Sequence, residues 1–286
     1  RQVLIYANAT TPATMQLSDT VEGIGCIARD SIQTTSTDVL FLSNSGVRSL
    51  MRTIQEKSAP ERDLSKNIRN DLMSAIAGET LTNVKSVYSE REAFYLLVTP
   101  SIDTTWCFDT KAYLPDGAAR VTTWDSITPK SFLSRRDGSL YIGKNGYIGY
   151  YNTYQDYDTA YRMLYYTNHA DLGNQNVTSI LKKLSTVVIG GTNQVVTFKW
   201  GFDFKTNYLS DNATIPIQGV SYYGIAEYGA NATTIAYYSD GVALQTLTVA
   251  ATGTGKVVQT GYESDINGTP LSIQKIEIQA KNGKMT

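Results

Sequence analysis

The stretch from Asp38 to Ile76, DVLFLSNSGVRSLMRTIQEKSAPERDLSKNIRNDLMSAI, decides the fold class of this chain. Its opening part, Asp38–Ser43, is apolar, rich in β-prone side chains and bounded by polar residues, which predicts a strand. Asn44-Ser45-Gly46 is typical of a turn. We therefore expect Val47–Ile54 to run back as the second strand of a hairpin, although its apolar residues do not alternate strictly.

The second half of the stretch predicts one short amphipathic helix. Pro60 suits the first turn of a helix, and Gly78 suits its C-cap. Apolar residues recur every four positions between them, which places them on one helix face that must pack against another element. These apolar residues are Leu64, Ile68, Leu72 and Ile76.

Composition indicates a large, mainly β protein with a nearly neutral surface. The chain has 286 residues, enough for one large domain or two ordinary ones. It contains 20 tyrosines and many threonines, residue types that favour half-buried pleated surfaces. The net charge is −1, so the sequence lacks the basic footprint of a nucleic-acid reader and any polybasic membrane patch.

Cysteine usage and hydropathy add two expectations. Cys26 and Cys107 are too few for a disulfide scaffold, and we expect two reduced thiols, with a disulfide left open. No apolar run approaches the length of a membrane span. Arg1-Gln2-Val3-Leu4 leads straight into a predicted strand rather than a signal peptide. We expect the chain to be part of a longer protein.

Further hairpins follow along the first half of the chain. Val3–Ala9 and Ala13–Asp19 form one predicted hairpin, and Thr104–Tyr113 is expected to pair with Ala93–Pro100. Ala93–Pro100 is almost continuously apolar, as in strands buried on both faces. The strongest hairpin signals are the Asp-Gly and Asn-Gly pairs at Asp137-Gly138 and Asn145-Gly146.

Three similar units recur in this half. Each is an apolar strand, a short turn and an outgoing strand, and they start at Asp38, Glu92 and Ser139, 54 and 47 residues apart. Blades of β-propellers repeat at about 40–50 residues. This spacing favours β-propeller-like blades, and the alternative is a generic antiparallel meander.

The residue composition of the chain changes after Thr153. Thr153–Asn174 is rich in Tyr and Asp and is interpreted as a connector, with the boundary near Tyr154–Tyr165. The strands expected after it indicate a β-sandwich-like domain. The predicted organisation is therefore propeller-like blades over residues 1–155 and a β-sandwich-like domain over residues 156–286. The expected strand regions are Ser179–Gly191, Val195–Asn207, Ala213–Gly219 and Val242–Lys281, with Gly-, Ala- and Tyr-rich runs in Tyr222–Gly241.

No motif predicts catalysis, a cofactor or a metal. The lone histidine, His169, lies near Asp171, but there is no nucleophile elbow and no His/Cys cluster. Thr252–Lys256 resembles part of a phosphate loop but lies between predicted strands, so a hairpin turn is favoured. The basic pairs Arg135-Arg136 and Lys182-Lys183 are interpreted as solvated turns, with contact to DNA phosphates as the alternative.

Acidic and aromatic residues cluster between residues 103 and 125. Such a cluster can form a sugar-binding face, but Tyr and Trp more often fill β cores, and paired catalytic carboxylates cannot be assigned from sequence. The residues concerned are Asp103, Asp109, Asp116 and Asp125, with Trp106 and Trp124.

Five segments, taken in their order along the chain, indicate a resemblance to a known protein family. They are LIYANATTPATMQL (Leu4–Leu17), DVLFLSNSGVRSL (Asp38–Leu50), DLSKNI (Asp63–Ile68), Val121–Gly146 and Val257–Lys284. In this order they resemble segments of the tail nozzle proteins of short-tailed bacteriophages, often called tail tubular protein B. The N-terminal part that such proteins usually carry is missing here.

The resemblance implies a structural virion protein of the phage tail rather than an enzyme. Such proteins look like β-propeller and β-sandwich assemblies arranged as a six-fold ring, a homohexamer assembled in the host cytoplasm. The implied partners are the tail adaptor, tail fibre or spike proteins, and genomic DNA that passes through the ring during ejection without sequence-specific binding. The resemblance implies no cofactor.

Two other functions stay open at this point. One is a tail-associated carbohydrate-active or glycan-binding β-propeller, which would have paired acids in an aromatic cleft. The other is a β-propeller binding module outside phages, which would be monomeric.

Overall fold

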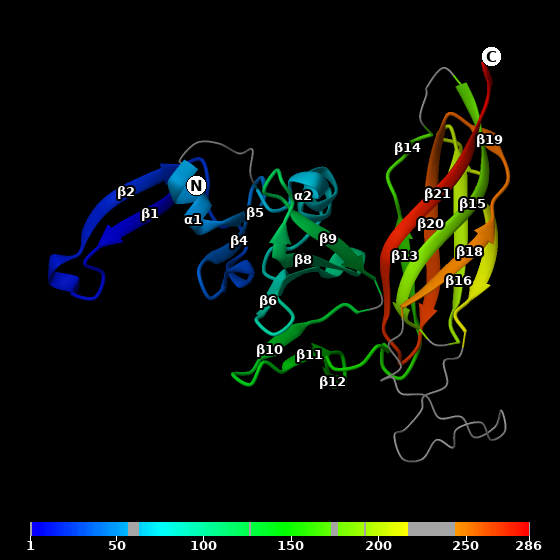
Figure 1. Cartoon of the computed structure of the whole chain (residues 1–286). Coiled ribbons are helices and arrows are strands. Elements are labelled where there is room, and N and C mark those ends of the chain that lie inside the picture. The colour runs from blue at the N-terminus through cyan, green and yellow to red at the C-terminus, as the bar shows by residue number, and fades with distance from the viewer. Residues whose placement is uncertain are drawn as a thin grey trace, which may run out of the picture. The chain divides into compact units, whose positions relative to one another are not determined.

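The chain is mainly β and divides into two compact units (Figure 1). The computed structural model describes residues 2–56, 63–125, 127–172, 177–191, 193–216 and 244–285. The units are Arg1–Asn152 and Thr153–Thr286. All strand pairings among the described residues are antiparallel, and no described helix is long and apolar enough to cross a membrane. The predicted run Tyr222–Gly241 lies outside the described residues.

The first unit begins with a hairpin that forms a two-stranded sheet of its own, as predicted. We call it the arm. Its strands are β1 (Gln2–Ala7) and β2 (Gln16–Glu22), joined through the 3₁₀ turn η1 (Pro12–Thr14).

The hairpin at Asp38 is confirmed, but its return strand is shorter than predicted. The strand β5 ends at Ser49, and the chain turns into the helix α1, so the prediction that Val47–Ile54 is a strand was wrong in its second half. Ser49 explains the change, because its Oγ accepts the Arg52 N–H (3.2 Å), as an N-cap residue does. The elements here are η2 (Arg29–Ser31), β3 (Gln33–Thr34), β4 (Val39–Ser43), β5 (Gly46–Ser49) and α1 (Leu50–Glu56).

The predicted amphipathic helix starts later than expected. Residues 57–62, including Pro60, lie outside the description, and Asp63–Ser65 are not helical. The Leu64 N–H donates to the Val47 carbonyl (3.0 Å), and the Leu64 carbonyl accepts the Ala119 N–H (3.0 Å), so strand-like pairing holds the segment out of the helix. The helical part comprises η4 (Lys66–Ile68) and α2 (Arg69–Ala77), with Gly78 as the predicted C-cap. The predicted apolar face is confirmed, because Leu64, Leu72 and Ile76 are buried in one core and Ile68 packs against it.

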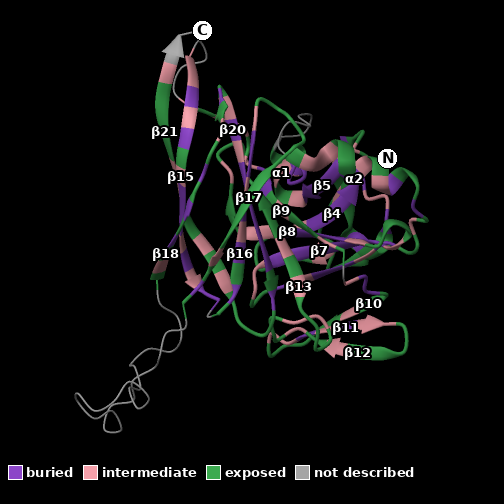
Figure 2. Cartoon of the chain, turned by 90° about the vertical axis from the view of Figure 1, so that its right-hand side faces the viewer, coloured by how far each residue is buried: buried purple, intermediate pink, exposed green. Residues whose placement is uncertain are grey.

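A four-stranded sheet, β6-β7-β8-β9, lies at the centre of this unit. All six residues of β7 are buried, as its apolar run predicted (Figure 2). Tyr95 and Leu97 enter the core shared with α2, whereas Phe94 and Leu96 enter a second core on the opposite face. The bounds are β6 (Lys85–Ser89), β7 (Phe94–Thr99), η5 (Pro100–Ile102), β8 (Thr104–Tyr113) and β9 (Ala119–Trp124).

A small three-stranded sheet covers the second face of the central sheet. Leu140 and Ile142 pack there against Phe94 and Leu96. Its two hairpins turn where the Asp-Gly and Asn-Gly pairs predicted, with Gly138 at φ 83° and Gly146 at φ 87°, values that favour glycine. The strands are β10 (Ser131–Ser134), β11 (Leu140–Lys144) and β12 (Tyr147–Tyr150).

The second unit contains two antiparallel sheets around one core, to which both contribute (Figure 2). One sheet has the order β13-β20-β16-β17, with β14 also paired to β20, and in the other β15 pairs with β18, β19 and β21. The interpretation of Thr153–Asn174 as a connector was wrong, because Tyr161–Tyr166 is a strand paired along its length with β20. The bounds are β13 (Tyr161–Tyr166), β14 (Ala170–Asp171), β15 (Val177–Gly190), β16 (Val195–Phe202), β17 (Leu209–Thr214), β18 (Leu244–Ala250), β19 (Thr254–Gly255), β20 (Val257–Ile266) and β21 (Leu271–Met285).

Candidate functional site

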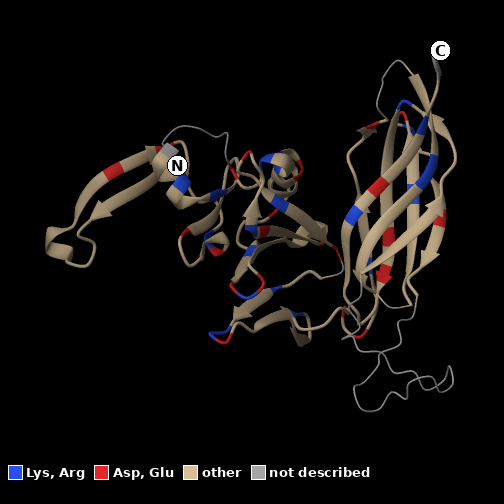
Figure 3. Cartoon of the chain, in the orientation of Figure 1, with Lys and Arg blue, Asp and Glu red and all other residues tan. Residues whose placement is uncertain are grey.

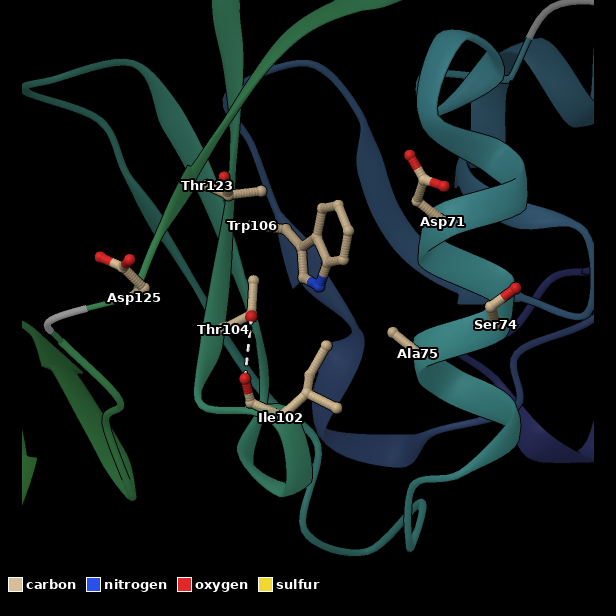
Figure 4. A pocket seen from close by; sticks show the side chains of 8 residues that line it. All are labelled: Asp71, Ser74, Ala75, Ile102, Thr104, Trp106, Thr123 and Asp125. Atoms are coloured by element: carbon tan, nitrogen blue, oxygen red, sulfur yellow. Dashed lines mark hydrogen bonds between the residues drawn. The ribbon is translucent and has the colours of Figure 1, made fainter. Parts of the chain in front are cut away.

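An open groove of about 630 Å³ lies in the first unit, between the helix α2 and the strands β8 and β9 (Figure 4). We call it the α2 groove. The helix forms one wall and the sheet forms the other, because both pack on the same core. The lining residues are Asp71, Ser74, Ala75, Ile102, Thr104, Trp106, Thr123 and Asp125.

The floor of the α2 groove combines aliphatic and hydroxyl groups with the edge of a tryptophan. Trp106 is only 6% exposed, and its indole N–H donates to the Thr99 hydroxyl (3.1 Å). Ile102, in contrast, is half exposed, and the Thr104 hydroxyl donates to its carbonyl (3.0 Å). The indole is therefore held in the core, and Ile102 is the most exposed apolar side chain of the lining.

Two carboxylates stand on opposite sides of the indole, Asp71 on the helix and Asp125 just after β9 (Figure 4). Neither makes a hydrogen bond or an ion pair with another described residue, and none of the described lining residues is a Lys or Arg. Among the described residues, the groove therefore offers two carboxylates without a cationic partner, beside an aliphatic surface. Such a site suits a ligand that donates hydrogen bonds and carries positive charge.

The structure brings together only part of the acidic and aromatic cluster noted in the sequence. Trp106 and Asp125 meet in the α2 groove, with Asp103 in the adjacent turn at the end of η5. Asp109 instead accepts the Lys111 N–H (2.8 Å).

The remaining members of that cluster have structural roles elsewhere. Asp116 accepts the Ala118 N–H (3.1 Å) and lies 3.6 Å from the Lys66 ammonium. Trp124 packs in the other core, stacked on Tyr151 with the ring centroids 6.1 Å apart.

The sequence analysis did not identify Asp71 and Ser74 as site residues. They lie three positions apart on α2, so both project toward the same side of the helix. This spacing was visible in the sequence, but the wall that faces them comes later in the chain, about 30 residues on for β8 and about 50 residues on for the lining residues at the end of β9, and could not be assigned.

A second polar cluster, also missed, surrounds Glu263 of β20. Its carboxylate is 4% exposed and is bound by the Arg162 guanidinium (2.5 Å), the Tyr166 hydroxyl (2.5 Å) and the Lys199 ammonium (2.6 Å). Burial alone would raise the pKa of this carboxyl, but hydrogen bonds from Lys199, Tyr166 and Arg162 outweigh it and hold the pKa at about 2. The Tyr166 ring also covers Gly261, its direct cross-strand neighbour. The side chains of this cluster therefore connect β13 and β16 to β20.

The other residues singled out from the sequence have structural surroundings. The His169 ring packs on Phe204, with centroids 4.2 Å apart. Cys26 and Cys107 are separate free thiols. Burial raises the pKa of the Cys107 thiol to about 12, whereas the Cys26 thiol donates to the Ala28 carbonyl (3.0 Å).

The glycine-rich stretch Thr252–Lys256 continues beside β15 in the line of β18, and its strand β19 pairs with Ser179 and Ile180. The predicted hairpin turn was therefore wrong, because β18 and β20, the longer strands on either side, belong to different sheets. Gly253 has φ 118°, and a Cβ there would overlap the Phe202 ring, so close packing requires glycine.

The two basic pairs differ in their surroundings. Arg135 and Arg136 lie in the turn between β10 and β11, as predicted, and both are exposed. Lys182 and Lys183 lie inside β15 at an irregularity of register, so their interpretation as a turn was wrong.

Comparisons with known proteins identify no family for this chain. No protein-family model and no curated protein matches it. Among solved structures, one similar chain is a Bacillus thuringiensis Cry1Da tryptic core variant, with 10% sequence identity and a TM-score of 0.25, covering 98% of this chain. The chain spans 47% of that protein's length. A likeness this weak supports no statement about fold or function.

Proposed function

We propose that this chain is a structural subunit of the tail nozzle of a short-tailed phage. The observation that carries the proposal is that two segments of the resemblance, Asp38–Leu50 and Asp63–Ile68, interlock in the structure. Two of the segments that carry the resemblance to the nozzle proteins therefore also contact each other in the folded chain.

The interlocking is tight and largely buried. The Val47 N–H donates to the Ser65 hydroxyl (3.0 Å), and the Asp63 carboxylate, whose side chain is 0% exposed, pairs with the Arg69 guanidinium (2.5 Å). A Cβ on Gly46 would overlap the Ser65 hydroxyl. These residues hold the hairpin β4–β5 against the segment that leads into α2, a role in the framework rather than in chemistry.

The arrangement of sheets supports a more detailed proposal about the fold. Three antiparallel sheets, β3–β5, β6–β9 and β10–β12, follow one another in the chain, and the middle sheet shares one core with each neighbour. We infer that they are β-propeller-like blades. The two sheets of the second unit, which share a single core, form the proposed β-sandwich-like domain.

The arm provides a surface for assembly. A two-stranded sheet alone is marginally stable in water. The arm nevertheless exposes large apolar side chains, including Leu4 and Tyr6 on β1 and Leu17 on β2. Exposed apolar surface of this kind marks interaction sites. In the proposed nozzle the arm packs on a neighbouring subunit, and head-to-tail contacts close a six-fold ring in the tail, beside the tail adaptor and the fibre or spike proteins.

Charge distribution suits a tube through which DNA slides. Lysine, arginine, aspartate and glutamate are interspersed over both units (Figure 3), and the net charge of the whole chain is −1. Tight DNA binding requires many neutralised phosphates. An interspersed surface favours passage of DNA over retention.

The geometry gives less support to a glycan-binding function. Stacking on a sugar needs an accessible aromatic face, and Trp106 is 6% exposed while Trp124 lies in a different core.

The proposal is tested by measuring the mass of the protein by light scattering at micromolar concentration, alone and with a tail adaptor protein. Negative-stain electron microscopy of the same samples would show whether particles are rings. We expect a six-fold ring under at least one condition. A monomer under both conditions contradicts the proposal.

A further inference from the structure

We propose that the α2 groove binds the Arg135-Arg136 turn of a second copy of this chain. The inference rests on the proposed ring, for which it names one subunit contact. It follows from the chemistry of the groove, the geometry of the turn and their placement on the first unit.

The groove matches an arginine side chain. Asp71 and Asp125 provide two carboxylates that no described residue neutralises, and a guanidinium can bind a carboxylate through two parallel hydrogen bonds. Ile102 and Ala75 offer aliphatic surface for the stem of such a side chain. The hydroxyl of Ser74 adds an acceptor on the same wall as Asp71.

The Arg135-Arg136 turn presents cations on a preformed loop. The Arg135 N–H donates to the Ser139 carbonyl (2.9 Å), and the Gly138 N–H donates to the Arg135 carbonyl (3.0 Å), so the backbone of the turn is fixed. Arg136 is exposed and pairs with no described residue. Arg135 is 56% exposed, and its nearest carboxylate, Asp137, is 3.5 Å away at the surface. A pair that exposed contributes little and can be exchanged.

The groove and the turn belong to opposite sides of the central sheet β6–β9. The helix α2 packs on the face that carries Tyr95 and Leu97, whereas β10 and β11 pack on the face that carries Phe94 and Leu96. A contact between them in two copies is therefore heterologous and can repeat from subunit to subunit, as closure of a ring requires.

The test uses charge reversal in the full chain. One variant carries Asp71→Lys and Asp125→Lys, and the other carries Arg135→Glu and Arg136→Glu. Like charges then meet at every contact, and we expect the dissociation constant for assembly to rise by about tenfold or more in each variant. An equimolar mixture should recover the ring, because alternating subunits satisfy every groove and every turn in a six-membered ring.

Controls separate this inference from other outcomes. Asp211→Lys reverses an exposed charge on β17, outside groove and turn, and should leave assembly unchanged. Circular dichroism and thermal melting confirm that each variant is folded. If the wild-type chain forms no ring, the proposed function fails. Two results would overturn this inference alone, provided that the wild-type chain forms a ring. One is a groove variant that assembles with the same affinity as the wild type, and the other is an equimolar mixture of the two variants that does not form the ring.

Discussion

Replacing Glu263 by glutamine should destabilise the second unit by an amount that depends on pH. The carboxylate is 4% exposed and receives hydrogen bonds from Arg162, Tyr166 and Lys199. Glutamine keeps the size of the side chain but removes the negative charge. Two cations then face a neutral group, and β20 loses its charged connection to both neighbouring strands.

The magnitude follows from the pKa of the carboxyl. The pKa of this carboxyl is about 2 in the folded protein, whereas an unperturbed glutamate carboxyl has a pKa of 4.5. At 1.36 kcal/mol per pH unit, this interval corresponds to about 3 kcal/mol of stability at neutral pH. Because the folded pKa is depressed, this contribution is complete above about pH 4.5 and is lost as the pH falls toward 2. By pH 3, about 2 kcal/mol of it is already lost.

The assay is hydrogen exchange in increasing urea, followed by mass spectrometry on peptides from β16 and β20, which reports on the second unit separately from the first. We expect Glu263→Gln to lower the free energy of unfolding by about 2–3 kcal/mol at pH 7 and by about 1 kcal/mol at pH 3. Asp265→Asn is the matched control, since Asp265 is 69% exposed and lies 3.8 Å from Arg162. Equal stability of wild type and Glu263→Gln at pH 7, or a difference that stays constant down to pH 3, would refute the reasoning.

Two further predictions concern the first unit. Gly46→Ala should lower its stability by about 2–4 kcal/mol in thermal or urea unfolding, because Gly46 has φ 133° and a Cβ there overlaps the Ser65 hydroxyl. Gly146→Ala, at φ 87° but in open space, should cost only about 1–2 kcal/mol, and equal losses would contradict the packing argument. Cys107 should resist a thiol reagent at pH 8 until urea unfolds the protein, because burial raises its pKa to about 12. The folded chain should then react with the reagent through one thiol, that of Cys26, and a Cys26→Ser variant that still reacts when folded would contradict this.

Part of the candidate site was visible in the sequence. Trp106 and Asp125 belonged to the acidic and aromatic cluster, but Asp103, Asp109 and Asp116 belonged to it equally. Spacing could not separate them, because membership of the groove depends on which residues face α2.

The sequence by itself determined features whose causes lie within a few residues. The turns at Asp137-Gly138 and Asn145-Gly146 follow from backbone conformations that glycine adopts without strain. The burial of β7 on both faces follows from its continuous apolar run, Phe94–Thr99. Local composition is sufficient in such cases because the same residues would form the same element in many surroundings.

Tertiary structure decided the features in which distant segments supply the energy. Tyr161–Tyr166 reads as a polar connector, yet it is a strand because β20, about 100 residues later, provides its hydrogen-bond partners. Asp63–Ser65 has helical spacing, yet Val47 and Ala119 pair with its backbone and hold it out of the helix. The α2 groove likewise exists only where the helix and the strands β8 and β9 meet. Pairing and packing across the chain outweigh the small local preferences of such segments.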